Sequence, residues 1–419
     1  MDRGASAVVD GETLSVILDL IRTRRALTRP ELGRVSGLGR TVVTQRVAEL
    51  IGFGMVEEGR LGPSTGGRAP RQLSFCAASG SVLVAEFGAT GVAAGLVDLQ
   101  GRILGHREEP LDIVSGPESC LTRVEELFDD LLATTHGAGP LWGIGVGVPG
   151  PVEFATGRPI APPIMPGWDG YPIRDRLSAR HDVPVWVDNE VNLMALGDLR
   201  AGLAQGDDDV LFVKVGTGIG AGLISGGRLH RGAQGCAGDI GHVAVHAEDP
   251  PLCRCGNVGC LEAMAGGAAI ARDATQAARE NRSEFLAQLL DGRPTLEASD
   301  VVLGVEHGDP VCVELLGHAG RLIGETLAGL VNFFNPSIIL VGGRLASSDV
   351  LISGMRQTVY QRSLPLATRE LRIVRSSTAN RAGLLGAGSM VTDELFARPK
   401  LEAWIDSGSP SGHPELVDY

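Results

Sequence analysis

Three of the seven cysteines of the chain lie within eight positions of one another, and a histidine precedes them. The four residues are His242, Cys253, Cys255 and Cys260. Four thiolate or imidazole ligands are the number that a closed tetrahedral zinc site uses, whereas a catalytic zinc keeps one position open for water. Gly256 and Gly259 between the cysteines suit a tight loop around a metal. The spacing predicts a structural zinc site, with free thiols grouped by chance as the alternative.

A second group of polar residues lies where an apolar strand is expected to end. PVWVDNEVNLMALGDLRAG, residues 184–202, reads as a strand, then DNEVN, then a helix. Polar groups at the carboxyl end of a strand commonly face a ligand, and a carboxylate there can accept a proton from a substrate hydroxyl. The same side chains can equally cap the helix. The residues alone leave both interpretations open.

The body of the chain contains an internal repeat. VAEFGATGVAAGLVDLQGRIL, from Val84, and FVKVGTGIGAGLISGGRLH, from Phe212, each read as strands joined by a glycine turn that contains threonine. Helices are predicted at 118–133 after the first copy, and at 272–290 and 319–334 after the second. Repeated strands and helices predict two similar α/β lobes that face a cleft. Paired glycine turns can bind phosphate through backbone amides, although glycine is common throughout this chain.

The first 75 residues have the pattern of a small helical module. Apolar residues with helical spacing predict a first helix, and they are Leu14, Ile17, Leu18 and Ile21. Thr28 and Glu31 have the spacing of a capping box, which predicts a second helix that ends at Gly37. A third helix is expected from 40 to 51, followed by a hairpin around LGPSTGGRAP. This order predicts a winged helix-turn-helix, with a protein-interaction module as the alternative.

The outer face of the third predicted helix is small and polar, which suits the major groove of DNA. Arginines on a glycine-rich wing suit phosphates or a narrow minor groove. The predicted base contacts are Thr41, Thr44 and Gln45, and the predicted phosphate or minor-groove contacts are Arg40, Arg46, Arg68 and Arg71. Residues 1–75 contain eleven arginines and eight acidic residues, in a chain whose net charge is −13. The basic end is therefore the candidate for binding a polyanion.

The remaining composition predicts a cytoplasmic protein. The four other cysteines are scattered, and the sequence contains neither a signal peptide nor an apolar run of about 18 residues. We therefore expect no membrane partner and no disulfide framework. The tail after Arg398 is rich in Ser, Pro, Gly and acidic residues, which predicts disorder for 399–419.

Several of these segments together resemble the ROK family, named for repressors, open reading frames and kinases. GDIGHVAVHAEDPPLCRCGNVGCLE is similar to its joined sugar and zinc signature. EFGAT and VGTGIGAG look like its two phosphate motifs, DNEVN like its catalytic segment, and IILVGGRLA like its adenosine-side turn. The STGGRAP wing resembles that of the regulators of the family. The resemblance implies the two-lobed, actin-like ATPase fold of sugar kinases behind a winged helix-turn-helix.

Site residues follow from the resemblance by position. The implied sugar-binding residues are Asn189, Glu190, Asp239, His242 and Glu262, and the implied phosphate turns contain Glu86, Gly88, Thr90, Gly216, Thr217 and Gly218. In that family the histidine both binds zinc and touches the sugar. Lys214 in the second phosphate strand is either near a phosphate or solvated, and we expect the solvated position.

Three carboxylates depart from the family pattern. Glu86 and Glu190 stand where the kinases have Asp, and Asp239 stands where they have Glu. A displacement of about 1 Å can cost about 100-fold in rate, whereas a ligand hydroxyl can still be bound after a small shift or through a water. The sequence therefore predicts a site that binds sugar but has lost kinase activity, with ATP not expected as a cofactor.

These observations combine into one hypothesis with two alternatives. We expect a winged helix-turn-helix at 1–76, a first lobe at 80–195 to which 383–398 returns, and a second lobe with the zinc site at 196–382. The expected protein is a repressor that binds operator DNA as a homodimer or tetramer and responds to a sugar or sugar phosphate. The alternatives are an ATP-dependent sugar kinase with an added DNA-binding domain, and a structural dimerisation platform.

Overall fold

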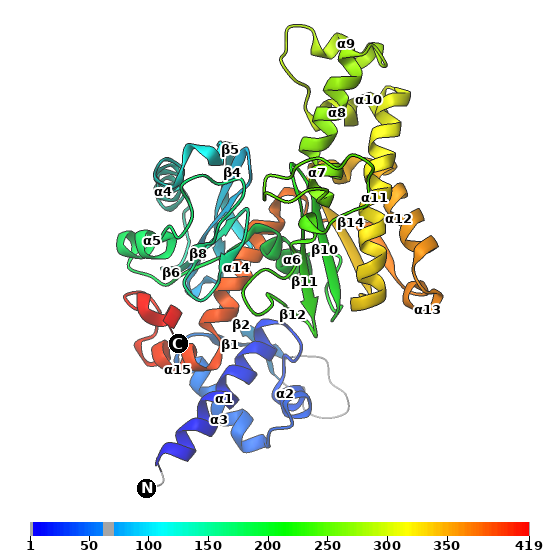
Figure 1. Cartoon of the computed structure of the whole chain (residues 1–419). Helices are drawn as coiled ribbons and strands as arrows, with labels where there is room; N and C mark the ends of the chain where they lie inside the picture. Colours follow the sequence, from blue (N-terminus) through cyan, green and yellow to red (C-terminus); the bar gives the residue numbers. More distant parts are fainter. Residues whose placement is uncertain (1–2, 62–70, 419) are drawn as a thin grey trace.

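The computed structural model describes residues 3–61 and 71–418, and the chain forms three parts (Figure 1). A small helical part at the N-terminus lies beneath two α/β lobes in this view, and the C-terminal segment lies between the first lobe and this N-terminal part. None of the described helices combines the length and apolar character that crossing a membrane requires.

The N-terminal part consists of three helices and a hairpin. Its elements are α1 (Arg3–Arg22), α2 (Arg29–Ser36), α3 (Arg40–Gly52) and the antiparallel strands β1 (Val56–Leu61) and β2 (Arg71–Phe75). The predicted apolar stripe of α1 is buried. Thr28 forms the predicted capping box with Glu31, and Gly37 ends α2 with a φ of 71°. The three predicted helices are therefore confirmed.

The first lobe is built on a five-stranded sheet with the order β5-β4-β3-β6-β9. Its strands are β3 (Ser81–Phe87), β4 (Gly91–Asp98), β5 (Ile103–Pro110), β6 (Leu141–Val148) and β9 (Val185–Asn189). Its other elements are η1 (Ala77–Ser79), η2 (Ile113–Ser115), α4 (Pro117–Thr134), α5 (Ile173–His181) and the hairpin β7 (Val152–Glu153) and β8 (Arg158–Pro159). Strands β3, β4 and β5 are antiparallel, and β6 and β9 continue the sheet in parallel.

The second lobe repeats this topology, with the order β12-β11-β10-β13-β14. Its strands are β10 (Val210–Val215), β11 (Ile219–Ser225), β12 (Arg228–Leu229), β13 (Ile338–Gly342) and β14 (Arg372–Arg375). Its helices are α7 (Leu261–Ala265), α8 (Gly267–Arg279), α9 (Glu284–Leu290), α10 (Ala298–Glu306), α11 (Pro310–Phe334), η4 (Arg344–Ser347), α12 (Asp349–Arg362) and α13 (Pro365–Thr368). Again three antiparallel strands are followed by two parallel ones. The repeat seen in the sequence is thus confirmed as a repeat of sheet topology.

The predicted helices of the lobes agree with the structure to different degrees. The helix expected at 118–133 is α4. The single helix expected at 272–290 is wrong, because Asn281 adopts a φ of 54° and Ser283 caps a separate helix, α9. The helix expected from Ala319 begins earlier, at Pro310, since the side chain of Asp309 accepts a hydrogen bond from the amide of Cys312.

Two helices cross between the lobes. Helix α6 (Glu190–Ala201) follows β9 of the first lobe but packs on β10 and β11 of the second. Helix α14 (Ala382–Leu395) follows η5 (Ala379–Arg381) of the second lobe but packs on β3 and β6 of the first. Figure 1 shows both helices between the two sheets. Each lobe is therefore followed by a helix that packs on the sheet of the other lobe, in addition to the covalent connection between the lobes.

The predicted disorder of 399–419 is wrong for the residues that the structure describes. The segment forms α15 (Arg398–Trp404), η6 (Ile405–Ser407) and η7 (Pro414–Asp418). Trp404 is fully buried, and its indole Nε1 donates to the carbonyl of Leu395 at 2.9 Å. Its ring also packs edge-on against Trp142, with centroids 5.1 Å apart. The tail is therefore ordered despite its polar composition, because most of its few apolar side chains are buried against the rest of the protein.

Candidate functional site

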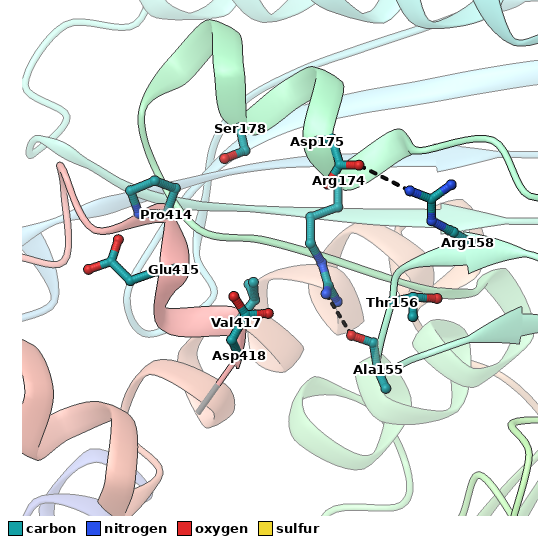
Figure 2. Close-up of a pocket in the computed structure, with 10 residues that line it drawn as sticks. All are labelled: Ala155, Thr156, Arg158, Arg174, Asp175, Ser178, Pro414, Glu415, Val417 and Asp418. Carbon is teal, nitrogen blue, oxygen red and sulfur yellow. Dashed lines mark hydrogen bonds and ion pairs between the residues drawn. The ribbon is translucent and has the colours of Figure 1, made fainter.

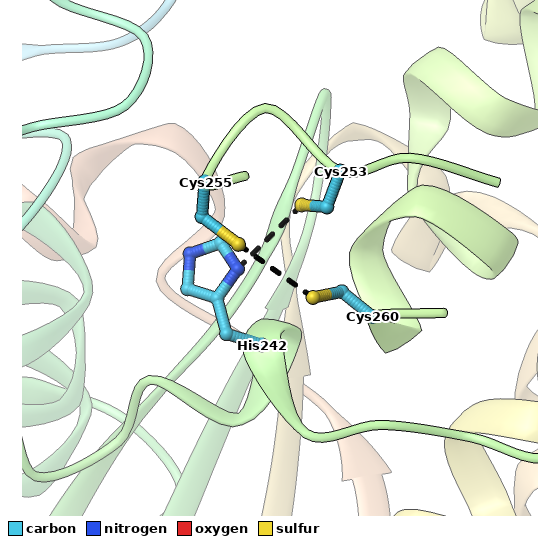
Figure 3. Close-up of side chains that lie close together, drawn as sticks. All are labelled: His242, Cys253, Cys255 and Cys260. Atoms are coloured by element: carbon cyan, nitrogen blue, oxygen red, sulfur yellow. Dashed lines mark hydrogen bonds between the residues drawn. The ribbon is translucent and has the colours of Figure 1, made fainter. Parts of the chain in front are cut away.

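The four predicted metal ligands lie together in the structure (Figure 3). Nδ1 of His242 is 3.7 Å from Sγ of Cys253, and the Sγ atoms of Cys255 and Cys260 are 3.6 Å apart. All four donor atoms lie within 4.8 Å of one another. The predicted ligand set therefore converges on a single point.

The backbone of this loop explains the convergence. His242 ends η3 (Ile240–His242), and Cys260 immediately precedes α7. Gly256 and Gly259 have φ values of 91° and 75°, a region that glycine adopts without strain. The amide of Cys253 donates to the carbonyl of Asn257 at 2.7 Å, which closes the turn. The glycines therefore allow the chain to fold back so that the thiols face inward.

The distances fit a tetrahedral metal ion. With metal–sulfur bonds of about 2.3 Å and metal–nitrogen bonds of about 2.0 Å, the edges of the tetrahedron are about 3.8 Å between sulfurs and about 3.5 Å between nitrogen and sulfur. The observed pairs, at 3.6 Å for the two sulfurs and 3.7 Å for nitrogen and sulfur, are close to these values. The cluster could hold a metal ion, and its four donors would fill every position of the tetrahedron.

The cysteine loop also positions a carboxylate through α7. Glu262, two residues after Cys260, accepts a hydrogen bond from the amide of Ile219 at 3.1 Å. A Cβ on Gly218 would overlap the same carboxylate, so any other residue there would displace the side chain of Glu262. Burial raises the pKa of Asp239, and the charge of Glu262 raises it further, while His242 opposes both. The metal cluster, Glu262 and Asp239 therefore form one continuous group.

A second group crosses from one lobe to the other. Nε of Arg231, after β12, donates to Oδ2 of Asp188 at 2.7 Å. Oδ1 of Asp188 accepts from Nδ2 of Asn192 at 2.9 Å. The guanidinium of Arg231 also lies 3.7 Å from the centroid of the Phe154 ring, a cation–π contact. The strand-end carboxylate of the first lobe is therefore fixed by an arginine of the second.

Asn189 caps α6, so the capping interpretation of the DNEVN segment is confirmed for this residue. Its Oδ1 accepts from the amides of Val191 and Asn192 at 2.8 and 3.3 Å. Its Nδ2 donates to the carbonyl of Gly150 at 2.9 Å. The side chain that caps α6 is therefore the amide of Asn189 and not a carboxylate. Glu190 does not cap the helix, and its carboxylate faces the second lobe.

Lys214 is not solvated, and that expectation is wrong. Its Nζ lies 3.1 Å from Oε1 of Glu190, and the two side chains are only 19% and 8% exposed. Burial raises the pKa of Glu86 to about 7, although Lys214 opposes the shift. Burial likewise raises the pKa of Glu190, against the same lysine. Burial alone would lower the pKa of Lys214, but Glu190 and Glu86 together raise it.

Two acceptor atoms beside this ion pair have no donor among the residues that the structure describes. They are Oε2 of Glu190 and Oδ1 of Asn192, and both are buried. Buried polar atoms in folded proteins nearly always have a hydrogen-bond partner. Hydroxyl groups of a ligand could supply the two donors.

The structure brings most of the implied sugar residues into one electrostatic environment. The charge of Asp239 acts on Glu190, and Glu262 and His242 act on Asp239. The sequence did not single out Asn192 beyond its place in DNEVN, nor did it indicate Arg231. Arg231 lies in a loop without a motif, so only its contact with Asp188 across the lobes reveals it.

The two implied phosphate turns occupy equivalent places after β3 and β10. The amide of Gly88 donates to the carbonyl of Gly91 at 2.8 Å, and that of Gly216 to Gly218 at 3.0 Å. The first two amides of α8, Gly267 and Ala268, donate to the carbonyls of Gly216 and Thr217 at 2.8 and 3.0 Å. These amides of α8 are therefore engaged by the turn itself.

Figure 2 shows a pocket elsewhere in the molecule, with a volume of about 410 Å³. It lies between the β7–β8 hairpin, α5 and η7. The guanidinium of Arg174 reaches across it to the carbonyl of Ala155 at 2.6 Å, and Arg158 pairs with Asp175 at 3.2 Å. None of the implied sugar residues lines this pocket.

Most of the predicted DNA contacts on α3 face outward. Arg40, Thr41, Thr44 and Gln45 are exposed. Arg46 is a correction: only 6% of it is exposed, because its Nε donates to Oγ1 of Thr13 at 3.0 Å and its Nη1 pairs with Glu49. It joins α3 to α1 and does not face a polyanion. Arg71 is exposed on β2, whereas Arg68 lies outside the described residues.

Comparison with known proteins identifies relatives of two kinds. The model of the ROK family matches residues 82–394. The xylose repressor of Caldicellulosiruptor bescii is 28% identical over 391 residues, which cover 92% of this chain and 96% of the repressor. The glucokinase of Halalkalibacterium halodurans is 31% identical over 311 residues, which cover 74% of this chain and 94% of the kinase.

A solved structure matches nearly the whole chain. It is a ROK family transcriptional regulator, a homologue of the MLC protein of E. coli, with a TM-score of 0.80 at 24% identity. The match covers 95% of this chain and 99% of the regulator. A match of this extent must include much of the N-terminal helical part, since so little of the chain remains outside it.

Proposed function

The chain belongs to the ROK family, and from this premise we propose that it is a sugar-responsive, DNA-binding repressor of carbohydrate metabolism genes. The likeness to the xylose repressor supports this function, because it spans 92% of this chain, whereas the likeness to the glucokinase spans 74%. Winged helix-turn-helix proteins usually read paired half-sites, so the proposal includes a homodimer or tetramer.

The observation that carries the sugar proposal is the pair of buried acceptors at the start of α6. Oε2 of Glu190 and Oδ1 of Asn192 lack donors in the described structure. A sugar presents several hydroxyl donors at short spacing, which suits two neighbouring acceptors. We assign Glu190, Asn192, Asp239, His242 and Glu262 to sugar binding, with Asn189 fixing the start of the helix.

Binding of a neutral sugar can be tested by calorimetry with D-xylose and D-glucose, for the wild type and Glu190→Gln. We expect at least one sugar to bind the wild type, and the variant to bind it at least tenfold more weakly. Failure of a broad panel of hexoses, pentoses and N-acetyl amino sugars to bind or to raise the melting temperature would favour the dimerisation platform instead.

We propose that the metal of the cysteine cluster is zinc and that it is structural. Three thiolates and one imidazole form a typical zinc donor set, and the loop that they close is continuous with Glu262 and Asp239. His242, Cys253, Cys255 and Cys260 would hold the ion, which would supply no reaction step but would fix the position of both carboxylates.

Metal analysis of the purified protein tests this assignment. We expect about one zinc per chain in the wild type, and loss of zinc together with a lower melting temperature in Cys255→Ser. Cys236→Ser is the matched control, since Cys236 is exposed and lies outside the cluster. Equal zinc content in both variants would refute the assignment.

We propose that α3 reads the major groove through Thr41, Thr44 and Gln45. Arg40, Arg71 and Arg68 would neutralise phosphates, or reach the minor groove, around it. The exposed polar face of α3 supports this placement, and the buried Arg46 supports it indirectly by holding α3 to α1.

The DNA proposal can be tested on duplexes selected from a random pool by the protein. Gln45→Ala should lose about 1 to 3 kcal/mol of discrimination at one base pair. Gln276→Ala is a matched control, because both glutamines donate to a glutamate four residues later, Glu49 at 3.1 Å and Glu280 at 2.6 Å. Equal specificity in the two variants would refute the assignment of α3.

The kinase alternative meets an obstacle at Lys214. The resemblance implies that Glu190 stands at the catalytic base, and this carboxylate is already paired with Lys214. A base that is longer than the usual Asp and bound to an internal cation is poorly suited to accept a proton from a sugar. A coupled ATP turnover assay of the zinc-loaded wild type, beside Glu190→Asp, should detect no turnover by the wild type. Turnover would make the protein a kinase with an added DNA-binding domain.

A further inference from the structure

Helices α6 and α14 both begin near the proposed sugar site, and the far end of α14 contacts the N-terminal part. Helix α6 starts at Glu190, and the carboxylate of Glu86 lies against Gly383 in the first turn of α14. With 12 and 14 residues, the helices are about 18 and 21 Å long. Figure 1 shows them extending towards α1. The pair therefore connects the two regions that a sugar-responsive repressor must couple.

The two helices contact each other backbone to backbone. A Cβ on Gly197 would overlap the carbonyl oxygen of Ala382, and a Cβ on Gly386 would overlap that of Leu193. Such close packing leaves no room for one helix to slide past the other without disturbing both. The helices can therefore pivot about this contact, but they cannot slide along each other.

The far end of the pair is joined to α1 by a shared carboxylate. Oδ2 of Asp393, on α14, pairs with Nη2 of Arg200 on α6 at 2.7 Å. Oδ1 of Asp393 pairs with Nη2 of Arg22, the last residue of α1, at 2.6 Å. The side chain of Arg22 is only 10% exposed, and its guanidinium also lies over the ring of Phe396. A single residue thus bonds to both neighbours of α14.

From α1 the connection continues to α3. The buried Arg46 of α3 donates to Oγ1 of Thr13 on α1 at 3.0 Å. Val43 and Val47 of α3 are buried in the same cluster as Leu14 and Ile17 of α1. A rotation of α1 would therefore carry α3 with it.

We propose that Asp393 is the residue that transmits the state of the sugar site to the DNA-binding helices. This inference rests on the proposed function. A sugar that binds at Glu190 and changes the angle between the lobes also changes the angle at which α6 and α14 cross, because α6 packs on the second lobe and α14 on the first. Asp393 can keep both Arg200 of α6 and Arg22 of α1 in place only at one arrangement of α6, α14 and α1. A change of the crossing angle therefore reorients α1, and α3 moves with it.

The test compares sugar binding, operator binding and their coupling in the full-length protein. Asp393→Asn keeps the size of the side chain and removes its charge, and Arg200→Ala removes only the contact with α6. Asp130→Asn is the control, since Asp130 pairs with Arg107 at 2.7 Å on the opposite side of the first sheet and 47% of its side chain is exposed. The probes are D-xylose, D-glucose and a selected operator duplex.

In the wild type we expect the sugar to change the operator Kd by about 5- to 150-fold, the usual range of coupling between sites. In Asp393→Asn the sugar should still bind, but the change in operator Kd should fall to about twofold or less. Arg200→Ala should reduce the change at least threefold, which keeps the proposal testable if the first variant is unstable. Asp130→Asn should behave like the wild type.

The outcomes separate the two proposals. A wild type whose operator affinity no sugar alters would refute the proposed function. A wild type that responds, with Asp393→Asn and Arg200→Ala responding equally, would refute only the role of Asp393. If Asp130→Asn also lost the response, the role of Asp393 would be refuted as well, because the loss of any ion pair would then abolish the response to sugar.

Discussion

Lys214 lies between two glutamates and changes the chemistry available to both. Its ion pair with Glu190 occupies one oxygen of that carboxylate and leaves the other without a donor among the described residues. Glu86 is buried nearby, no ion pair joins it to any residue that the structure describes, and burial raises its pKa to about 7. The cluster holds two acids and one base, so its net charge depends on the protonation of Glu86.

This arrangement predicts a pH-dependent stability. The pKa of Glu86 is about 7 in the folded protein and 4.5 ordinarily, so between these pH values the folded state binds more protons than the unfolded state. The free energy of unfolding should therefore fall as the pH rises through this window, by at most about 3 kcal/mol. Glu86→Gln cannot titrate, so we expect it to be more stable than the wild type at pH 8 and similar at pH 5.

Urea denaturation at the two pH values measures the difference. Glu284→Gln is the control, since Glu284 is an exposed glutamate at the start of α9. If the difference between Glu86→Gln and the wild type is the same at pH 5 and pH 8, the raised pKa is not a property of the folded protein.

For individual residues, predictions from the sequence were correct where the spacing of the residues determines what they can bind. The four metal ligands could be predicted because a tetrahedral site needs four such donors close together. Arg46 and Lys214 were misplaced, because a helical or strand pattern tells which face a residue is on but not which partner is within reach. Arg46 is bonded to Thr13, which is 33 positions away in the sequence.

Helices α6 and α14 depend on glycine for their contact. Each contributes one glycine where the backbone of the other passes, so two helices from different lobes approach closely. Glycines also allow close contact where α6 and α14 pack on the sheets. A Cβ on Gly222 would lie 2.6 Å from that of Ala195, and one on Gly145 would lie 2.7 Å from the carbonyl oxygen of Ala387. Part of the high glycine content of the chain is therefore explained by helix packing and not by turns.

We expect Gly386→Ala to destabilise the protein by about 1 to 3 kcal/mol or more, because its methyl group would overlap α6. Gly329→Ala on α11 is the matched control. It lies in a helix, and a Cβ there would meet nothing within 4 Å, so the higher helix propensity of alanine should stabilise the protein by up to about 1 kcal/mol. Chemical denaturation of both variants checks the opposite signs, and equal effects would contradict the close packing.

Individual elements were predicted well where their ends carry local signals. The capping box at Thr28 and the glycine at position 37 fixed the bounds of α2. The division between α8 and α9 was missed because an asparagine and not a glycine takes the left-handed conformation there. The exchange of α6 and α14 between lobes could not be read from the sequence, since it depends on which sheet each helix reaches.

At the scale of the whole molecule, the C-terminal segment closes the junction between the N-terminal part and the first lobe. Phe75 of the N-terminal part, Trp142 of the first lobe and Trp404 of the tail all pack around Phe396. Ser15 of α1 also donates to the carbonyl of Phe396 at 2.7 Å. The tail therefore stabilises the position of the N-terminal helices relative to the lobes.

Removal of the Trp404 side chain should destabilise the folded protein. Trp404→Ala should lower the free energy of unfolding by about 3 to 5 kcal/mol, as for other large buried aromatic residues. Leu366→Ala, at a side chain that is 76% exposed, should change it by less than about 0.5 kcal/mol. Thermal and urea denaturation compare the two, and a small effect of Trp404→Ala would mean that the tail does not support the junction.

The path of α14 has a consequence for synthesis on the ribosome. The strand β6 is complete at residue 148, whereas the helix that covers its inner face begins at residue 382, about 230 residues later. At about 5 to 20 residues per second, this interval lasts roughly 10 to 50 seconds. Throughout it, the nascent first lobe lacks α14, the helix that covers the apolar face of its sheet. Synthesis of α14, and not the order of the lobes, therefore limits when the first lobe can reach its final fold.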